Sequence, residues 1–132
     1  MADKQELAAE DSDQQVKLIF VVDDDADIGE VIVTVIQEVT PYQAVLFTDG
    51  FQVLKAVRTL TPHLFLLDYW LPGMNGIELY DKLQESVDLQ QLPVIMMSAY
   101  LPNSELGERK IIPLHKPFEI NELLAKIAEL AS

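Results

Sequence analysis

The stretch LIFVVDDD, at residues 18–25, places five apolar residues directly before three carboxylates. A continuous apolar run rich in β-branched side chains is typical of a strand buried on both faces of a sheet. A helical pattern follows, because apolar side chains from Ile28 to Val39 recur at three- and four-residue spacing. A buried strand followed by an amphipathic helix predicts an α/β fold.

The same alternation continues to the end of the chain. Further strands are predicted at Tyr42–Phe47, Leu64–Leu67, Pro93–Met97 and Ile111–Leu114, and further helices at residues 50–60, Ile77–Val87 and residues 119–130. Strands that alternate with helices predict a single parallel sheet covered by helices on both faces. Residues 100–110 are rich in helix-breaking side chains, so we expect the fourth helix to be shortened or irregular.

The composition limits the kind of protein. A length of 132 residues fits one domain, which we place at residues 16–132, after a flexible acidic N-terminal arm at residues 1–15. The net charge of −13 opposes direct binding to nucleic acid or anionic membranes. The absence of cysteine excludes disulfide chemistry. Residues 1–6 lack the features of a signal peptide and no apolar run is long enough to span a membrane, so we expect a cytoplasmic protein.

Polar residues follow or end four of the predicted strands. Asp23 and Asp24 follow the first, Asp68 the third, Ser98 the fourth and Lys116 the fifth. The carboxyl ends of parallel strands meet at one edge of a sheet, where such folds bind ligands. Clustered acids repel one another, and a bound divalent cation is the usual reason for bringing them together. The sequence therefore predicts one shared pocket.

Each of these residues also has a simpler interpretation. A lone acid at a strand end is more often a helix cap than a metal ligand, and we assign Asp25 or Asp27 to that role. His63 and His115 lack the partners expected of a metal site. The functional interpretation depends on the convergence of the other residues on one pocket.

Four pieces of the chain carry a resemblance to a known family. They are VVDDD at 21–25, LDYWLPGMNG at 67–76, PVIMMSAY at 93–100 and KPF at 116–118. In this order they resemble the receiver domain of two-component response regulators, over roughly residues 17–130. The resemblance implies a doubly wound, flavodoxin-like or CheY-like sheet of five strands in the order 2-1-3-4-5.

The resemblance also implies an activity. Asp68 would accept a phosphoryl group from a phosphohistidine on a sensor histidine kinase or phosphotransfer protein, or from a small phosphodonor. Ser98 and Lys116 would bind phosphoryl oxygens. The domain would signal through protein–protein contacts with an unknown downstream protein, and it would not be an enzyme beyond a slow self-dephosphorylation. A compact lysine charge suits a phosphate, and phosphoryl transfer needs positioning and charge neutralisation.

A Mg²⁺ site is implied in the same way. Asp24 and Asp68 would bind Mg²⁺ directly, together with the backbone carbonyl of Trp70, and Asp23 would act through a water. Mg²⁺ favours a few carboxylates and retains several waters, which fits this set.

The sequence departs from the family pattern on its output side. Receivers commonly carry a rotating Tyr or Phe three positions before the lysine, where this chain has Pro113. Ala99, Tyr100 and the 100–110 loop are the remaining candidates for a responsive element. Trp70 and Tyr100, two residues after Asp68 and Ser98, would crowd the path of a hydrolytic water and slow self-dephosphorylation.

Three alternatives remain open. A receiver-like binding module that no longer switches would fit Pro113 and the short loop. An aspartyl phosphatase would need a second acid two positions after Asp68, where Trp70 stands. A flavin protein would need a phosphate-binding loop after the first strand, where three aspartates would repel phosphate. The sequence does not identify the kinase, the downstream target, the signal or the oligomeric state.

Overall fold

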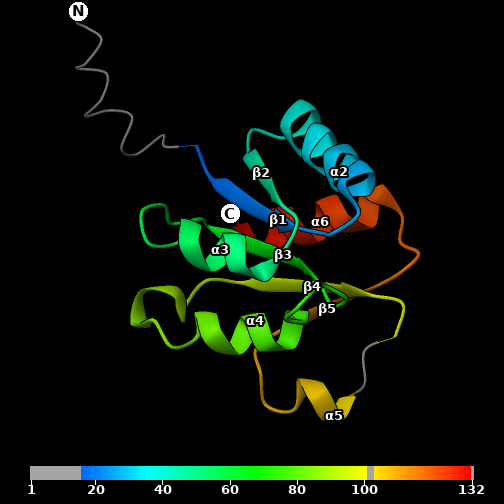
Figure 1. Cartoon of the computed structure of the whole chain (residues 1–132). Coiled ribbons are helices and arrows are strands. Elements are labelled where there is room, and N and C mark those ends of the chain that lie inside the picture. Colours follow the sequence, from blue (N-terminus) through cyan, green and yellow to red (C-terminus); the bar gives the residue numbers. More distant parts are fainter. Residues whose placement is uncertain (1–15, 101–102, 132) are drawn as a thin grey trace, which may run out of the picture.

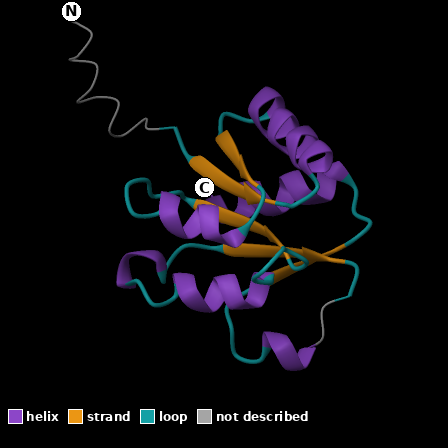
Figure 2. Cartoon of the chain, viewed as in Figure 1, coloured by secondary structure: helices purple, strands orange, loops and turns teal. Residues whose placement is uncertain are grey.

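The chain folds around one parallel sheet with helices on both faces (Figures 1 and 2). The computed structural model describes residues 16–100 and 103–131, so the predicted arm at residues 1–15 lies outside the described residues. The strands are β1 (Leu18–Val22), β2 (Gln43–Phe47), β3 (Leu64–Asp68), β4 (Val94–Ser98) and β5 (Ile112–His115). Their order in the sheet is β2-β1-β3-β4-β5, which confirms the predicted topology.

The helices divide between the two faces of the sheet. They are α2 (Ala26–Val39), α3 (Gly50–Ala56), α4 (Gly76–Leu83), α5 (Asn103–Leu106) and α6 (Ile120–Ala131), with a 3₁₀ turn, η1, at Val87–Leu89. Helices α2 and α6 cover one face, and α3 and α4 cover the other (Figure 1). Helix α5 lies on the α4 side, where Leu106 packs against the core. Its four residues confirm the predicted shortening of the fourth helix.

The central strands form two cores because successive side chains point to opposite faces. All five residues of β3 are buried. Phe65 and Leu67 pack under α3 and α4, whereas Leu64 and Leu66 pack under α2 and α6. The apolar run of β3 therefore contributes side chains to the cores on both faces of the sheet. Its last residue, Asp68, lies buried at the carboxyl end of the strand.

Side-chain caps fix where the helices begin. The carboxylate of Asp25 accepts hydrogen bonds from the backbone amides of Asp27 and Ile28, at the start of α2. Asn75 and Glu78 form a reciprocal capping box at the start of α4. Asp25 is therefore a helix cap, as predicted, and its carboxylate is engaged in that role.

A glycine lets α4 begin directly beside the end of β3. A Cβ at Gly76 would lie 2.8 Å from the backbone oxygen of Asp68 and 3.1 Å from Cε of Met96. The backbone oxygen cannot move aside without disturbing the strand. Gly76 thus holds the loop after Asp68 close to the sheet.

Three of the predictions about helices were wrong in detail. Helix α3 ends at Ala56 instead of continuing to residue 60. Helix α4 ends at Leu83 instead of continuing to Val87, whose side chain is 76% exposed. Leu89 is the residue buried in this segment, because the chain turns back through η1 to reach Pro93 and the next strand. In α2 the buried stripe consists of Gly29, Ile32 and Ile36, and it leaves part of the predicted apolar face exposed, namely Ile28, Val31 and Val39.

Within the described ranges, no helix is both long enough and apolar enough to cross a membrane.

Candidate functional site

The ends of four neighbouring strands place the predicted site residues along one edge of the sheet. Asp23 follows β1 and donates its backbone amide to Phe47 at the end of β2, over 3.0 Å. Asp68 ends β3, and Ser98 ends β4 beside it. Lys116 follows β5, and its backbone amide donates to the carbonyl of Ser98 over 2.8 Å. Parallel pairing therefore collects residues that are up to 93 positions apart in the sequence.

Three carboxylates meet in this pocket. One oxygen each from Asp23, Asp24 and Asp68 lies within 4.8 Å of the other two. Asp23 and Asp68 are buried, whereas Asp24 is exposed. Oδ1 of Asp23 accepts a hydrogen bond from the backbone amide of Asp25, and Oδ2 is buried with no hydrogen-bond partner among the described residues. A buried carboxylate oxygen without a partner is costly, and an oxygen-loving cation placed among the three acids would satisfy it.

Lys116 supplies the positive charge of the pocket. Its Nζ lies 3.3 Å from Oδ1 of Asp68. Burial raises the pKa of Asp68 to about 6, and the neighbouring Asp23 adds to the rise. Lys116 and the backbone amide of Trp70 act in the opposite direction, because both stabilise the ionised carboxylate. With a pKa of about 6, Asp68 is mainly ionised at neutral pH, and a cation in the pocket would favour that form further.

Ser98 is buried, and its hydroxyl is already engaged. Its Oγ donates to the carbonyl of Tyr100 over 2.6 Å and accepts from the amide of the same residue over 3.1 Å. Ala99 and Tyr100 are exposed beside it. Pro113 is also exposed and stands in β5 opposite Met96. The four residues of β5 include neither Phe nor Tyr, so the strand has no rotating aromatic side chain of that kind.

The two histidines lie outside this cluster. Nδ1 of His63 accepts the backbone amide of Leu18 over 2.9 Å, which gives it a structural role at the start of β1. His115 is paired with Ser98 in the sheet register and is exposed. In the part of the chain that the structure describes, the three aspartates are the one group of acids and histidines that is close enough to hold a metal.

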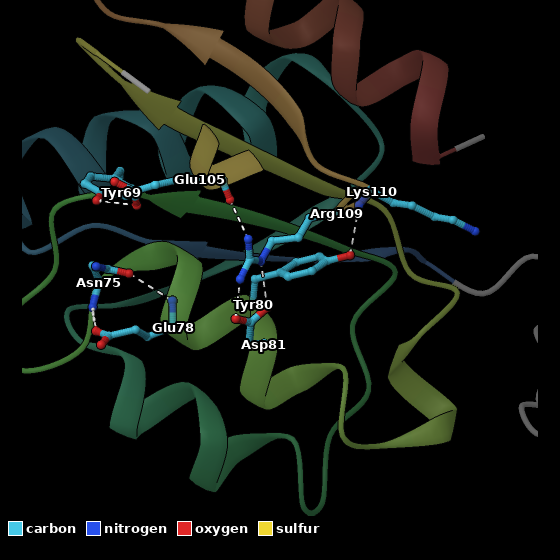
Figure 3. Close-up of polar contacts among 8 residues, drawn as sticks. All are labelled: Tyr69, Asn75, Glu78, Tyr80, Asp81, Glu105, Arg109 and Lys110. Atoms are coloured by element: carbon cyan, nitrogen blue, oxygen red, sulfur yellow. Dashed lines mark hydrogen bonds and ion pairs between the residues drawn. The ribbon is translucent and has the colours of Figure 1, made fainter. Parts of the chain in front are cut away.

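A polar network next to the site was missed by the sequence analysis (Figure 3). The hydroxyl of Tyr69 donates to Oε1 of Glu105 over 2.7 Å, and Arg109 forms a two-pronged pair with Asp81 at 2.8 and 2.7 Å. These partners are 36 and 28 residues apart. Neither helical nor strand periodicity relates positions at such separations, so these two pairs could not be predicted from the pattern of a single sequence.

Comparison with known proteins agrees with the geometry. Residues 19–128 match the family described as response regulator receiver domain. The chain is 36% identical over 115 residues to the DNA-binding response regulator MtrA of Mycolicibacterium paratuberculosis; the match covers 83% of this chain and 48% of that protein. The chain thus spans about half the length of the curated relatives it matches.

Solved structures show the same fold. The receiver domain of the Francisella response regulator 1452 is similar, with a TM-score of 0.78 and 27% identity over 87% of this chain and 96% of that one. The chemotaxis protein CheY4 of Vibrio cholerae gives a TM-score of 0.80 at 19% identity, over 87% of this chain and 98% of that one.

Proposed function

This chain belongs to the response regulator receiver domain family of two-component systems, and we propose that Asp68 is its phosphoacceptor. The observation that carries the proposal is a buried carboxylate at the end of β3, 3.3 Å from a lysine and clustered with two further acids. Neither a structural salt bridge nor a helix cap needs three carboxylates in one pocket. Phosphoryl transfer needs such a site, because it depends on positioning and charge neutralisation.

The chemistry follows from the side chains. An oxygen of Asp68 attacks the phosphorus of a phosphohistidine; a P–O bond forms, the P–N bond breaks, and its electron pair stays on the imidazole nitrogen. Lys116 neutralises a phosphoryl oxygen. Ser98 donates its hydroxyl to another phosphoryl oxygen after leaving the carbonyl of Tyr100. Only the ionised carboxylate of Asp68 is nucleophilic, and Lys116 favours that form.

The acidic cluster fits Mg²⁺. We propose Asp24, Asp68 and the backbone carbonyl of Trp70 as direct ligands, with Asp23 acting through a water. The orphaned Oδ2 of Asp23 supports this assignment. Bound Mg²⁺ would supply positive charge that offsets the repulsion between the carboxylates and the incoming phosphoryl group.

The partners are proposed to be proteins. The phosphodonor is a sensor histidine kinase or a histidine phosphotransfer protein, docking beside the pocket near α2. Exposed Ile28 and Val31 offer apolar contacts there, and a groove of about 420 Å³ beside Lys116 is lined in part by Ile28 and Phe118. The downstream target is also proposed to be a protein, because the net charge of −13 disfavours direct contact with nucleic acid.

The test is intact-mass spectrometry after incubation with acetyl phosphate and Mg²⁺. We expect one phosphoryl adduct on the wild type and none on Asp68→Asn. Asp25→Asn is the matched control, because asparagine caps a helix as well as aspartate does and the variant removes a nearby carboxylate. It should be labelled like the wild type. Labelling of Asp68→Asn would place the acceptor elsewhere.

A second candidate function is a receiver-like module that binds a partner without phosphorylation control. The observation in its favour is Pro113, since β5 has no aromatic side chain to rotate. An unlabelled wild type in the same experiment would favour this candidate. We propose in either case that the domain is not an enzyme with turnover on a separate substrate.

A further inference from the structure

Helix α5 is too short to be stable by itself. It spans four residues, Asn103–Leu106, and a single helical turn needs tertiary contacts to persist. Leu106 supplies a partly buried apolar contact with the core. The remaining attachments described for this helix are polar and come from Tyr69 and Arg109. Residues 103–112, from α5 to the start of β5, are called the α5 segment below.

One of these attachments starts beside the proposed phosphoacceptor. Tyr69 follows Asp68 directly; its backbone amide donates to Met97 over 2.9 Å, and its ring packs edge-on against Trp70 at 4.9 Å. Tyr69 is buried, and its hydroxyl donates to Oε1 of Glu105 over 2.7 Å. The bond to Glu105 also raises the pKa of Tyr69, so the hydroxyl remains a donor.

The second attachment joins the α5 segment to α4. Arg109 donates through Nη1 to the backbone carbonyl of Glu105 and through Nε and Nη2 to the carboxylate of Asp81. The next amide, that of Lys110, donates to the hydroxyl of Tyr80 over 3.0 Å. Figure 3 shows these side chains bridging from α4 to the α5 segment. The carboxylate of Glu105 therefore accepts a hydrogen bond from Tyr69, and its backbone carbonyl accepts one from Arg109. Arg109 is itself paired with Asp81 on α4.

We propose that two attachments clamp the α5 segment, the Tyr69–Glu105 bond to the loop after β3 and the Arg109–Asp81 pair to α4, and that phosphorylation of Asp68 loosens this clamp. The proposal rests on the proposed function. Phosphorylation engages one Asp68 oxygen in the acyl phosphate and draws the Ser98 hydroxyl away from the carbonyl of Tyr100. The first change is one residue away from Tyr69. The second releases Tyr100, which precedes the α5 segment in the sequence. The clamp would then be the responsive element of this domain, because Pro113 offers no aromatic side chain that could rotate.

Amide hydrogen exchange over residues 103–112 tests the clamp without phosphorylation. Tyr69→Phe keeps the ring and removes the hydroxyl, so we expect about tenfold faster exchange in the α5 segment, the equivalent of one charge-assisted hydrogen bond. Glu105→Gln retains an acceptor oxygen and should give a smaller increase. Tyr42→Phe is the matched control, because no hydrogen bond of the Tyr42 hydroxyl occurs among the described residues, and it should exchange like the wild type.

Asp81→Ala tests the other arm of the clamp at a half-exposed surface position, where folding is not at risk. Loss of the surface pair with Arg109 should raise exchange in the α5 segment by roughly two- to threefold. Unchanged exchange in both Tyr69→Phe and Asp81→Ala, with intact protection of β3 and β4, would overturn the clamp.

The same measurement after treatment with acetyl phosphate and Mg²⁺ tests the coupling. We expect faster exchange of the α5 segment in the phosphorylated wild type and little further change in Tyr69→Phe. A wild type that carries the phosphoryl adduct but shows unchanged exchange would overturn this inference and leave the proposed function intact. A wild type without an adduct would overturn the proposed function and the coupling together, and the unphosphorylated variants would still decide whether the clamp exists.

Discussion

The acidic pocket and the α5 segment lie on the same domain but are held in different ways. The pocket is made of residues at the ends of buried strands, so the sheet itself fixes their positions. The α5 segment has two apolar contacts with the core, Leu106 and Ile111, and is otherwise held by side-chain bonds between residues 28 and 36 positions apart. Rigid elements are suited to the precise geometry of phosphoryl transfer, whereas a segment held by a few bonds can be released. The difference suggests a fixed input site coupled to a loosely held output element.

Among substitutions that keep the proposed phosphoacceptor, removal of Lys116 should have the largest effect on labelling. In Lys116→Ala, Asp68 loses its countercharge at 3.3 Å, which raises its pKa further and leaves a phosphoryl oxygen unpaired. We expect labelling by acetyl phosphate to slow by about tenfold to a hundredfold. The measurement is the rate of adduct formation by mass spectrometry at neutral pH.

The control for this variant is Lys55→Ala, which removes an exposed lysine from α3. Lys55→Ala should be labelled at the wild-type rate. Exchange of the α5 segment in unphosphorylated Lys116→Ala should also match the wild type, because the ion pair described for Lys116 is with Asp68 and the bonds described for the clamp do not include Lys116. A labelling rate within about twofold of the wild type, a barrier change below roughly 0.5 kcal/mol, would remove Lys116 from the proposed mechanism.

Asp68→Asn should stabilise the fold while it abolishes labelling. The folded pKa of about 6 lies above the usual 3.8, so the native state binds more protons than the unfolded state between these values. The free energy of unfolding of the wild type therefore falls as the pH rises from about 4 to 6, because the native state must give up a proton that it binds more tightly than the unfolded state does. We expect Asp68→Asn to be more stable by about 1–3 kcal/mol at pH 7 without divalent cations.

Urea unfolding at several pH values measures this difference. The gain should be full above pH 6 and should vanish below about pH 4, where both states of Asp68 are protonated. Asp88→Asn, at an exposed position in η1, should show no comparable gain. Equal stability of Asp68→Asn and wild type across the whole range would mean that Lys116 fully compensates the burial of Asp68. Addition of Mg²⁺ should narrow the gap, since only the wild type retains the complete ligand set.

The contrast between the two regions also explains what the sequence could reveal. The parallel sheet and the pocket followed from apolar runs that end in polar residues, because a buried strand leaves its last residue at the sheet edge. The order of the strands followed from the resemblance to receiver domains. The end of α4 was misplaced because Val87 continues the helical spacing, while the turn through Leu89 is set by the return to β4. The Tyr69–Glu105 bond and the orphaned oxygen of Asp23 depend on three-dimensional packing. No local pattern encodes them.

Trp70 and Tyr100 lie between the two regions, and their replacement should give the smallest effect. Trp70 and Tyr100 are 66% and 72% exposed and stand two residues after Asp68 and Ser98, so we expect their rings to shield the phosphoryl group from water. In the double variant Trp70→Ser, Tyr100→Ser we expect self-dephosphorylation to speed by about fivefold, a barrier change of roughly 1 kcal/mol. The decay of the isolated adduct, followed by intact mass, measures the rate. Phe51→Ser removes an aromatic side chain from α3 at a position that is 56% exposed, and it should leave the half-life unchanged. If the double variant also keeps the wild-type half-life, the water path is not blocked by these rings, and the lifetime of the phosphorylated state is set by the buried pocket alone.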